Sequence, residues 1–229
     1  MITPTTTSAD VFTAAYDLFA REYLGGPRAV RPEELPARDA LLDALRSLHP
    51  QWATTLTSVL ENDAADTDSA ELAFLARMAT PAPGRYVPPY ASVYLDGGSL
   101  WGPTTFKVLT WHQAVGLEWD RGRVGPGGSR IAAPDHVGVE LAFLAILSER
   151  CVTGNSSSAI TDRRQTLLAH LAAWLPRYQK ALIEADRAFP PPSTLVDWTD
   201  LAQGVVQADL RRQPTKLRAV MNPRPTGEA

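Results

Sequence analysis

Asp135, His136 and, one helical turn later, Glu140 are the residues of this chain with the clearest potential for chemistry. On an α-helix His136 and Glu140 share one face, and Phe143 and Leu147 continue that face as an apolar stripe. An aspartate in the first turn also suits the free N–H groups and the dipole of a helix start. The spacing therefore leaves three interpretations open: an acid–base or metal site, the polar cap of a buried helix, or a partner-binding site.

An enzymatic interpretation finds little support elsewhere in the sequence. A metal site needs three or more ligands, and the other histidines, His49, His112 and His170, lie in unrelated contexts. The single Cys151 can form neither an internal disulfide nor a cysteine zinc cluster. The chain has no nucleophile elbow and no phosphate-binding glycine loop. An all-α nucleotide- or metal-dependent hydrolase using Asp135, His136 and Glu140 stays as an alternative.

A second group of residues lies in the stretch RYVPPYASVYLDGGSLWG, where Tyr90, Tyr94 and Trp101 stand among prolines and glycines. Aromatic side chains in irregular backbone often form recognition surfaces. They can equally fix a loop to the core by packing their own rings. A helical adaptor that binds protein through this stretch is therefore a further alternative.

The elements that must position these residues are helices, because apolar residues recur at helical spacing and strand alternation hardly appears. The pattern predicts an all-α fold of roughly eight to eleven helices. One helix runs from Pro134 to about Cys151, and Pro176 should kink or restart a later one. A long glycine-rich segment, 118–133, is predicted to be a hinge loop. We expect it to divide an N-terminal helical half, 1–117, from a C-terminal half, 134–213, with a mobile tail at 214–229.

Composition excludes several classes of protein. The chain is 45% hydrophobic and 21% charged, so it can bury a core and is not disordered as a whole. A net charge of −3 argues against nucleic-acid binding. The N-terminus lacks a secretory pattern, and no apolar run is long enough for a membrane span. We therefore expect a cytoplasmic protein.

The order of motifs resembles the TorD/DmsD/NarJ family of redox-enzyme maturation chaperones. The similarity runs from about residue 71 to residue 150: a short helix, PPY-x-SVY, a glycine turn, LWG, an amphipathic helix ending in GL, and the Asp-His helix. The later WLPRY helix is also similar.

This resemblance implies an all-helical chaperone without catalytic activity or a cofactor of its own, although it leaves guanine-nucleotide binding open. Such proteins bind the twin-arginine signal peptide of a molybdenum-cofactor oxidoreductase, assist cofactor insertion and delay export; some also bind the body of the client. The resemblance associates the Asp-His motif and the nearby aromatic residues with signal-peptide binding. A groove with carboxylates at its lip and an apolar floor would complement the cationic start and the apolar middle of such a peptide. The residues that would form it are Asp135, His136, Glu140, Tyr90, Tyr94, Trp101, Pro134 and Phe143.

The sequence departs from the family pattern at one position. The family motif is often Glu-Pro-x-Asp-His, whereas here Ala132 and Ala133 precede Pro134, so the acid is missing and the proline is shifted by one. Glu140 would supply negative charge from the next turn. The predicted hinge also suggests a choice between a monomer and a domain-swapped homodimer. The sequence does not name the client enzyme.

Overall fold

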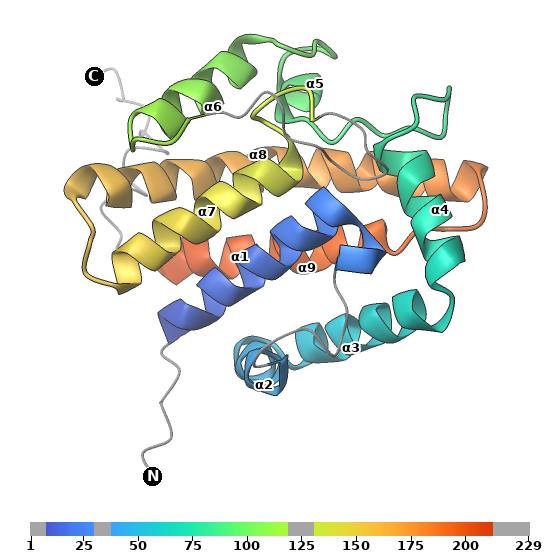
Figure 1. Cartoon of the computed structure of the whole chain (residues 1–229), viewed down its shortest axis with the longest axis horizontal. Helices are drawn as coiled ribbons and strands as arrows, with labels where there is room; N and C mark the ends of the chain where they lie inside the picture. Colours follow the sequence, from blue (N-terminus) through green and yellow to red (C-terminus); the bar gives the residue numbers. More distant parts are fainter. Residues whose placement is uncertain (1–7, 30–37, 119–130, 213–229) are drawn as a thin grey trace, which may run out of the picture.

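The computed structural model describes residues 8–29, 38–118 and 131–212, and in these ranges the chain is helical without any strand (Figure 1). This confirms the predicted all-α class. The predicted tail, 214–229, and most of the predicted hinge lie outside the described residues. The described helices are α1 (Ser8–Gly25), the short 3₁₀ helix η1 (Pro27–Ala29), α2 (Arg38–Leu48), α3 (Pro50–Ala65), α4 (Thr67–Met78), α5 (Ala91–Leu95), α6 (Pro103–Gln113), α7 (Val137–Val152), α8 (Ser158–Ala188) and α9 (Leu195–Arg212).

The core forms where α1, α7, α8 and α9 pack together. Helix α7 lies alongside α1 and against α8, and α9 packs against α8, α1 and α3 (Figure 1). One continuous cluster of buried apolar side chains includes residues from both predicted halves of the sequence. The two-half division therefore stays a prediction, and the packing of α1 against α7 is the most extensive contact between the halves.

The close contact between α1 and α7 depends on a glycine. A Cβ atom at Gly138 would lie 2.7 Å from Leu24 Cγ and 2.9 Å from Tyr23 Cβ, so any larger residue would push the helices apart. Packing at this density leaves no room for an added methyl group. The first turn of α7 is consequently fixed against the end of α1.

Helix α8 is the longest element, and it does not restart at Pro176. A proline inside a helix removes one backbone hydrogen bond and costs about 3 kcal/mol. Trp174, Leu175 and Tyr178, which flank the proline, are fully buried. Their burial holds the two sides of Pro176 in one helix, so of the two predicted outcomes, a kink or a restart, the restart is wrong and the kink stays a prediction.

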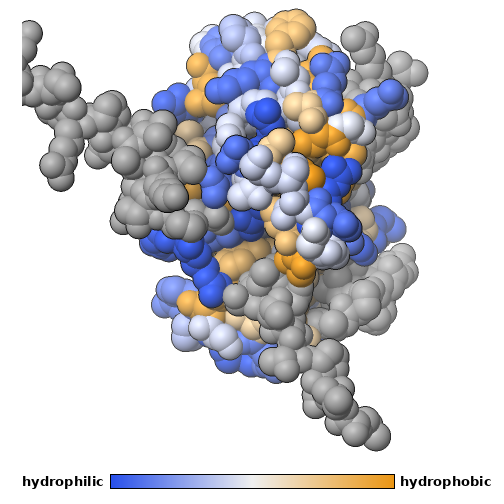
Figure 2. Space-filling view, turned by 90° about the vertical axis from the view of Figure 1, so that its left-hand side faces the viewer, coloured by the Kyte–Doolittle hydropathy of each residue, from blue (hydrophilic) through white to orange (hydrophobic). Residues whose placement is uncertain are grey.

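The surface is mainly hydrophilic, in contrast to the apolar core. On the face that looks out from the left-hand end of Figure 1, hydrophobic side chains form small patches separated by hydrophilic ones (Figure 2). Among the described residues, no helix is both long enough and apolar enough to cross a membrane.

Candidate functional site

Asp135 is a fully buried residue that joins three elements. Its Oδ2 accepts a hydrogen bond from the N–H of Ser92 at 2.8 Å, and its Oδ1 accepts one from the hydroxyl of Thr105 at 3.0 Å. Its backbone carbonyl accepts the N–H of Ala91 at 3.0 Å. The carboxylate thus caps the start of α5 and holds the start of α6, and the interpretation that it caps its own helix is wrong.

His136 is the residue that caps α7, which begins at Val137 rather than at the predicted Pro134. The Nδ1 atom of His136 accepts a hydrogen bond from the N–H of Gly138 at 3.1 Å, so Nδ1 carries no proton. An isolated antiparallel bridge pairs His136 with Tyr90, and the two rings meet edge to face at 5.3 Å. The His136 side chain is 3% exposed and therefore belongs to the interior.

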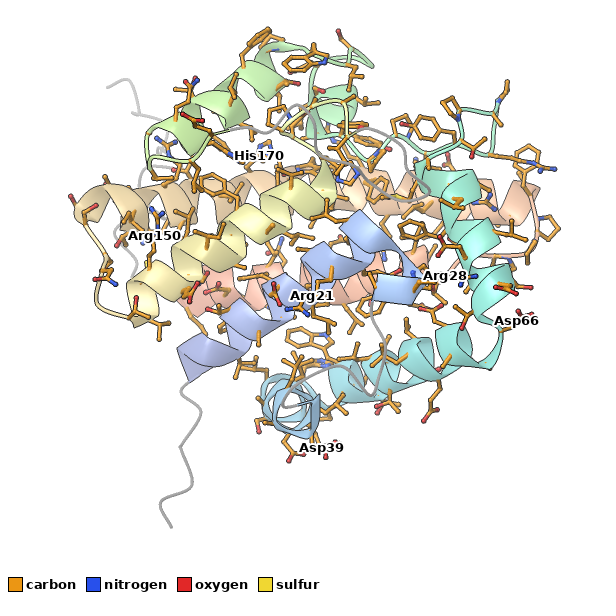
Figure 3. The ribbon with its side chains drawn as sticks, in the orientation of Figure 1. Arg21, Arg28, Asp39, Asp66, Arg150 and His170 are labelled. Carbon is orange, nitrogen blue, oxygen red and sulfur yellow. The ribbon has the colours of Figure 1, made fainter. Side chains whose placement is uncertain are left out.

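Glu140 is also fully buried, and α8 supplies its partners. One carboxylate oxygen lies 2.9 Å from His170 Nε2, and the other accepts the indole N–H of Trp174 at 3.0 Å. Burial raises the pKa of Glu140, while the charge and hydrogen bond of His170 lower it. For His170, burial lowers the pKa, but the attraction of Glu140 outweighs it and the pKa lies above its usual value. His170 is placed where α6, α7 and α8 come together (Figure 3).

These contacts correct the predicted geometry of the site. The sequence predicted Asp135 and Glu140 at the open lip of a groove, yet neither side chain reaches the surface. Donors from α5, α6 and α8 surround the two carboxylates, and such partners could not be read from spacing within α7 alone. In the described part of the chain, no group of three or more histidine, cysteine or acidic side chains is arranged to hold a metal ion.

Four other predicted site residues lie behind the surface or only partly at it. The hydroxyl of Tyr90 accepts the N–H of Ala132, the position of the missing acid, at 3.1 Å. Tyr94 donates its hydroxyl to the carbonyl of Pro88 at 2.9 Å and stacks on Trp174. Phe143 and Pro134 are buried, with the ring of Phe143 4.1 Å from that of His112. Tyr90 and Tyr94 therefore fix the PPY-x-SVY stretch to the core.

Trp101 differs from the other predicted residues because it is partly exposed and its backbone is unusual. Its φ of 64° lies in the left-handed region, which costs a residue with a side chain about 1–2 kcal/mol. Its ring lies 6.0 Å from that of Phe106, which is 56% exposed, and Leu100 beside it is 41% exposed. We call Leu100, Trp101 and Phe106 the α5–α6 apolar patch.

The start of α6, which carries this patch, is held by two carboxylates. Asp96 accepts both the N–H and the hydroxyl of Thr104, each at 2.8 Å, while Asp135 accepts the hydroxyl of the next residue, Thr105. A Cβ atom at Gly102 would lie 2.4 Å from Asp96 Oδ2, so the turn needs a glycine there.

The sequence interpretation missed Leu100, Phe106 and Asp96. The helical pattern of 103–113 offered one signal, since Phe106 does not share the face of Val108 and Trp111, both of which are buried.

The comparison with protein families decides which family this is. The family model described as nitrate reductase delta subunit matches residues 38–179, well over half of the 229 residues. The chain belongs to the nitrate reductase delta subunit family. The match runs from the start of α2 into α8 and includes every predicted site residue. No curated protein matches the chain.

Membership confirms the resemblance to the TorD/DmsD/NarJ chaperones. The nitrate reductase delta subunit family consists of chaperones of molybdoenzyme maturation that act with the catalytic subunit, and they are not enzymes. The hydrolase alternative is therefore wrong. Asp135, His136 and Glu140 serve in the structure as internal hydrogen-bonding groups of a helical chaperone.

Proposed function

We propose that this chain binds the twin-arginine signal peptide of a molybdoenzyme catalytic subunit and holds it until the cofactor has been inserted. A twin-arginine peptide has a cationic start followed by an apolar segment. The observation that carries the proposal is the α5–α6 apolar patch, which presents Leu100 and Phe106 to solvent beside the strained Trp101. Exposed apolar groups on a rigid support are typical of peptide-binding surfaces.

In this proposal the Asp-His pair acts by positioning rather than by direct contact. Asp135 joins α5 to α6, and His136 starts α7 and contacts Tyr90. Tyr94 and Trp174 stack behind the same segment. Pro134, Phe143 and Glu140 are buried, so we expect their substitution to act on binding through the structure that supports the patch.

Calorimetric titration with a synthetic twin-arginine leader from the nearest molybdoenzyme tests this proposal. We expect micromolar or tighter binding, weakened at least tenfold by Phe106→Asp and by a Lys-Lys version of the peptide. Val152→Asp is the matched control, because Val152 is 39% exposed on α7, away from the patch. Equal affinity of Phe106→Asp and wild type for the leader would exclude the patch as the binding surface.

A further inference from the structure

A second surface feature, separate from the α5–α6 apolar patch, is a groove of about 580 Å³. It opens between α4 and the segment that follows α8, and Figure 1 shows α4 beside the C-terminal end of α8. Its size falls within the range of sites that hold a peptide side chain or a small ligand. The wall from α4 includes Leu72, Leu75 and Ala76, and the opposite wall includes Phe189, Pro190 and Pro191.

The groove is preformed, because Arg77, one of the residues that line it, ties its two walls together. Arg77 of α4 is 2% exposed; its Nε donates to Asp186 Oδ1 at 2.8 Å, and its guanidinium also donates to the carbonyl of Phe189 at 2.5 Å. Gly84, with φ 75°, lies directly on the Phe189 ring, since a Cβ there would be 2.6 Å from Phe189 Cε2. A binding surface held this way loses little conformational entropy when a partner docks.

The groove combines apolar side chains with one positive charge, that of Arg85, for which the described residues supply no carboxylate. Leu72 is 70% exposed although it lies in the groove. The guanidinium of Arg85, at the rim, lies 5.4 Å from the centre of the Phe189 ring, and the described residues offer it no carboxylate partner. The charge of Arg77, in contrast, is already compensated by Asp186.

We propose that this groove docks a segment of the client's mature catalytic subunit in which a carboxylate neighbours apolar side chains. The proposal rests on the chaperone function proposed above. Arg85 complements such a carboxylate and disfavours the cationic start of a twin-arginine leader. The chaperone would then contact its client at two places, with the leader on the α5–α6 apolar patch and the body in the groove.

Binding of the catalytic subunit without its leader tests the groove. For Leu72→Asp and Arg85→Glu we expect at least tenfold weaker binding of the leaderless subunit, with leader-peptide affinity within twofold of wild type. The affinity of wild type should also fall with added salt more steeply than that of Arg85→Ala, because one ion pair is lost. Val152→Asp should bind both probes like wild type.

A photo-crosslinking residue in place of Leu72 identifies the occupant directly. We expect it to label an apolar segment of the mature subunit that contains Asp or Glu. Labelling of the leader or of a second copy of the chaperone would overturn the proposal, as would normal binding by Leu72→Asp and Arg85→Glu. If wild type binds the leader but not the leaderless subunit, the groove proposal fails while the proposed function stands. If it binds neither, both fail.

Discussion

The carboxylate of Asp135 and the hydroxyl of Thr105 form a buried hydrogen bond of 3.0 Å between residues that are 30 positions apart. The bond joins the residue before the cap of α7 to the first turn of α6. Since Asp135 also caps α5, one side chain sets how α5, α6 and α7 meet. The position of the α5–α6 apolar patch therefore depends on this contact.

Replacing Thr105 by valine should separate this positioning role from general stability. Valine keeps the shape but leaves one oxygen of Asp135 without its partner, so we expect a loss of about 1–2 kcal/mol in the free energy of unfolding. Leader-peptide affinity should fall several-fold, because the start of α6 shifts. Urea unfolding and calorimetry measure the two effects. Thr110→Val is the control, since the exposed Thr110 hydroxyl donates to the carbonyl of Phe106 one turn earlier in the same helix. Comparable losses in both variants would argue against positioning.

Trp101→Gly should weaken binding of the leader peptide while leaving the stability of the fold nearly unchanged. Glycine adopts the left-handed backbone without strain, and this relief of about 1–2 kcal/mol offsets the lost contact with the Phe106 ring. We expect the free energy of unfolding to stay within about 1 kcal/mol of wild type, while leader affinity falls at least tenfold. Unchanged affinity would remove Trp101 from the proposed binding surface.

Glu22 on α1 should make the fold less stable as pH rises. It is fully buried, and neither carboxylate oxygen has a hydrogen-bond partner among the described residues. Burial, followed by the charges of Asp63 and Glu71, raises its pKa well above the usual value. The folded state therefore binds the proton more tightly than the unfolded state, and stability present below about pH 4.5 is lost as pH rises through the folded pKa.

Glu22→Gln removes this ionisation, so we expect it to be more stable than wild type at pH 8 by at least about 1 kcal/mol and close to wild type at pH 4. Urea midpoints across this range provide the measurement. Glu184→Gln is the control, because the side chain of Glu184 is 64% exposed in a pair with Lys180. A gain from Glu22→Gln that does not change with pH would contradict the ionisation argument.

His112 should have the opposite effect to Glu22 and make the fold less stable as pH falls. Burial lowers its pKa to about 4, and its ring packs against Phe143. The folded state therefore binds this proton more weakly than the unfolded state, so stability present above about pH 6.5 is lost as pH falls toward 4, by up to about 3 kcal/mol. His112→Gln should lose less stability than wild type between pH 6.5 and 4.5. His49→Gln, at an exposed histidine, should follow wild type.

The sequence predicted the helices well, because their boundaries depend on local signals. These signals act within one or two helical turns: the spacing of apolar residues, Gly116 after the helix 103–113, and Pro50 at the start of α3. The prediction was wrong where distant residues decide the outcome. Pro176 does not restart α8, because burial of Trp174 and Tyr178 outweighs the local defect.

The sequence alone determined the all-α class and the family, and it predicted a binding role for the segment around Tyr90, Trp101, Asp135 and His136, which stays a prediction. Those features depend on residue type and spacing along the chain. Only the tertiary structure decided what each side chain does. Asp135 and Glu140 are internal acceptors because α5, α6 and α8 bury them and supply hydrogen-bond donors to their carboxylates. A buried carboxylate without such partners would be strongly destabilising. Leu100, Phe106 and Leu72 are exposed instead, and none of the described helices covers them.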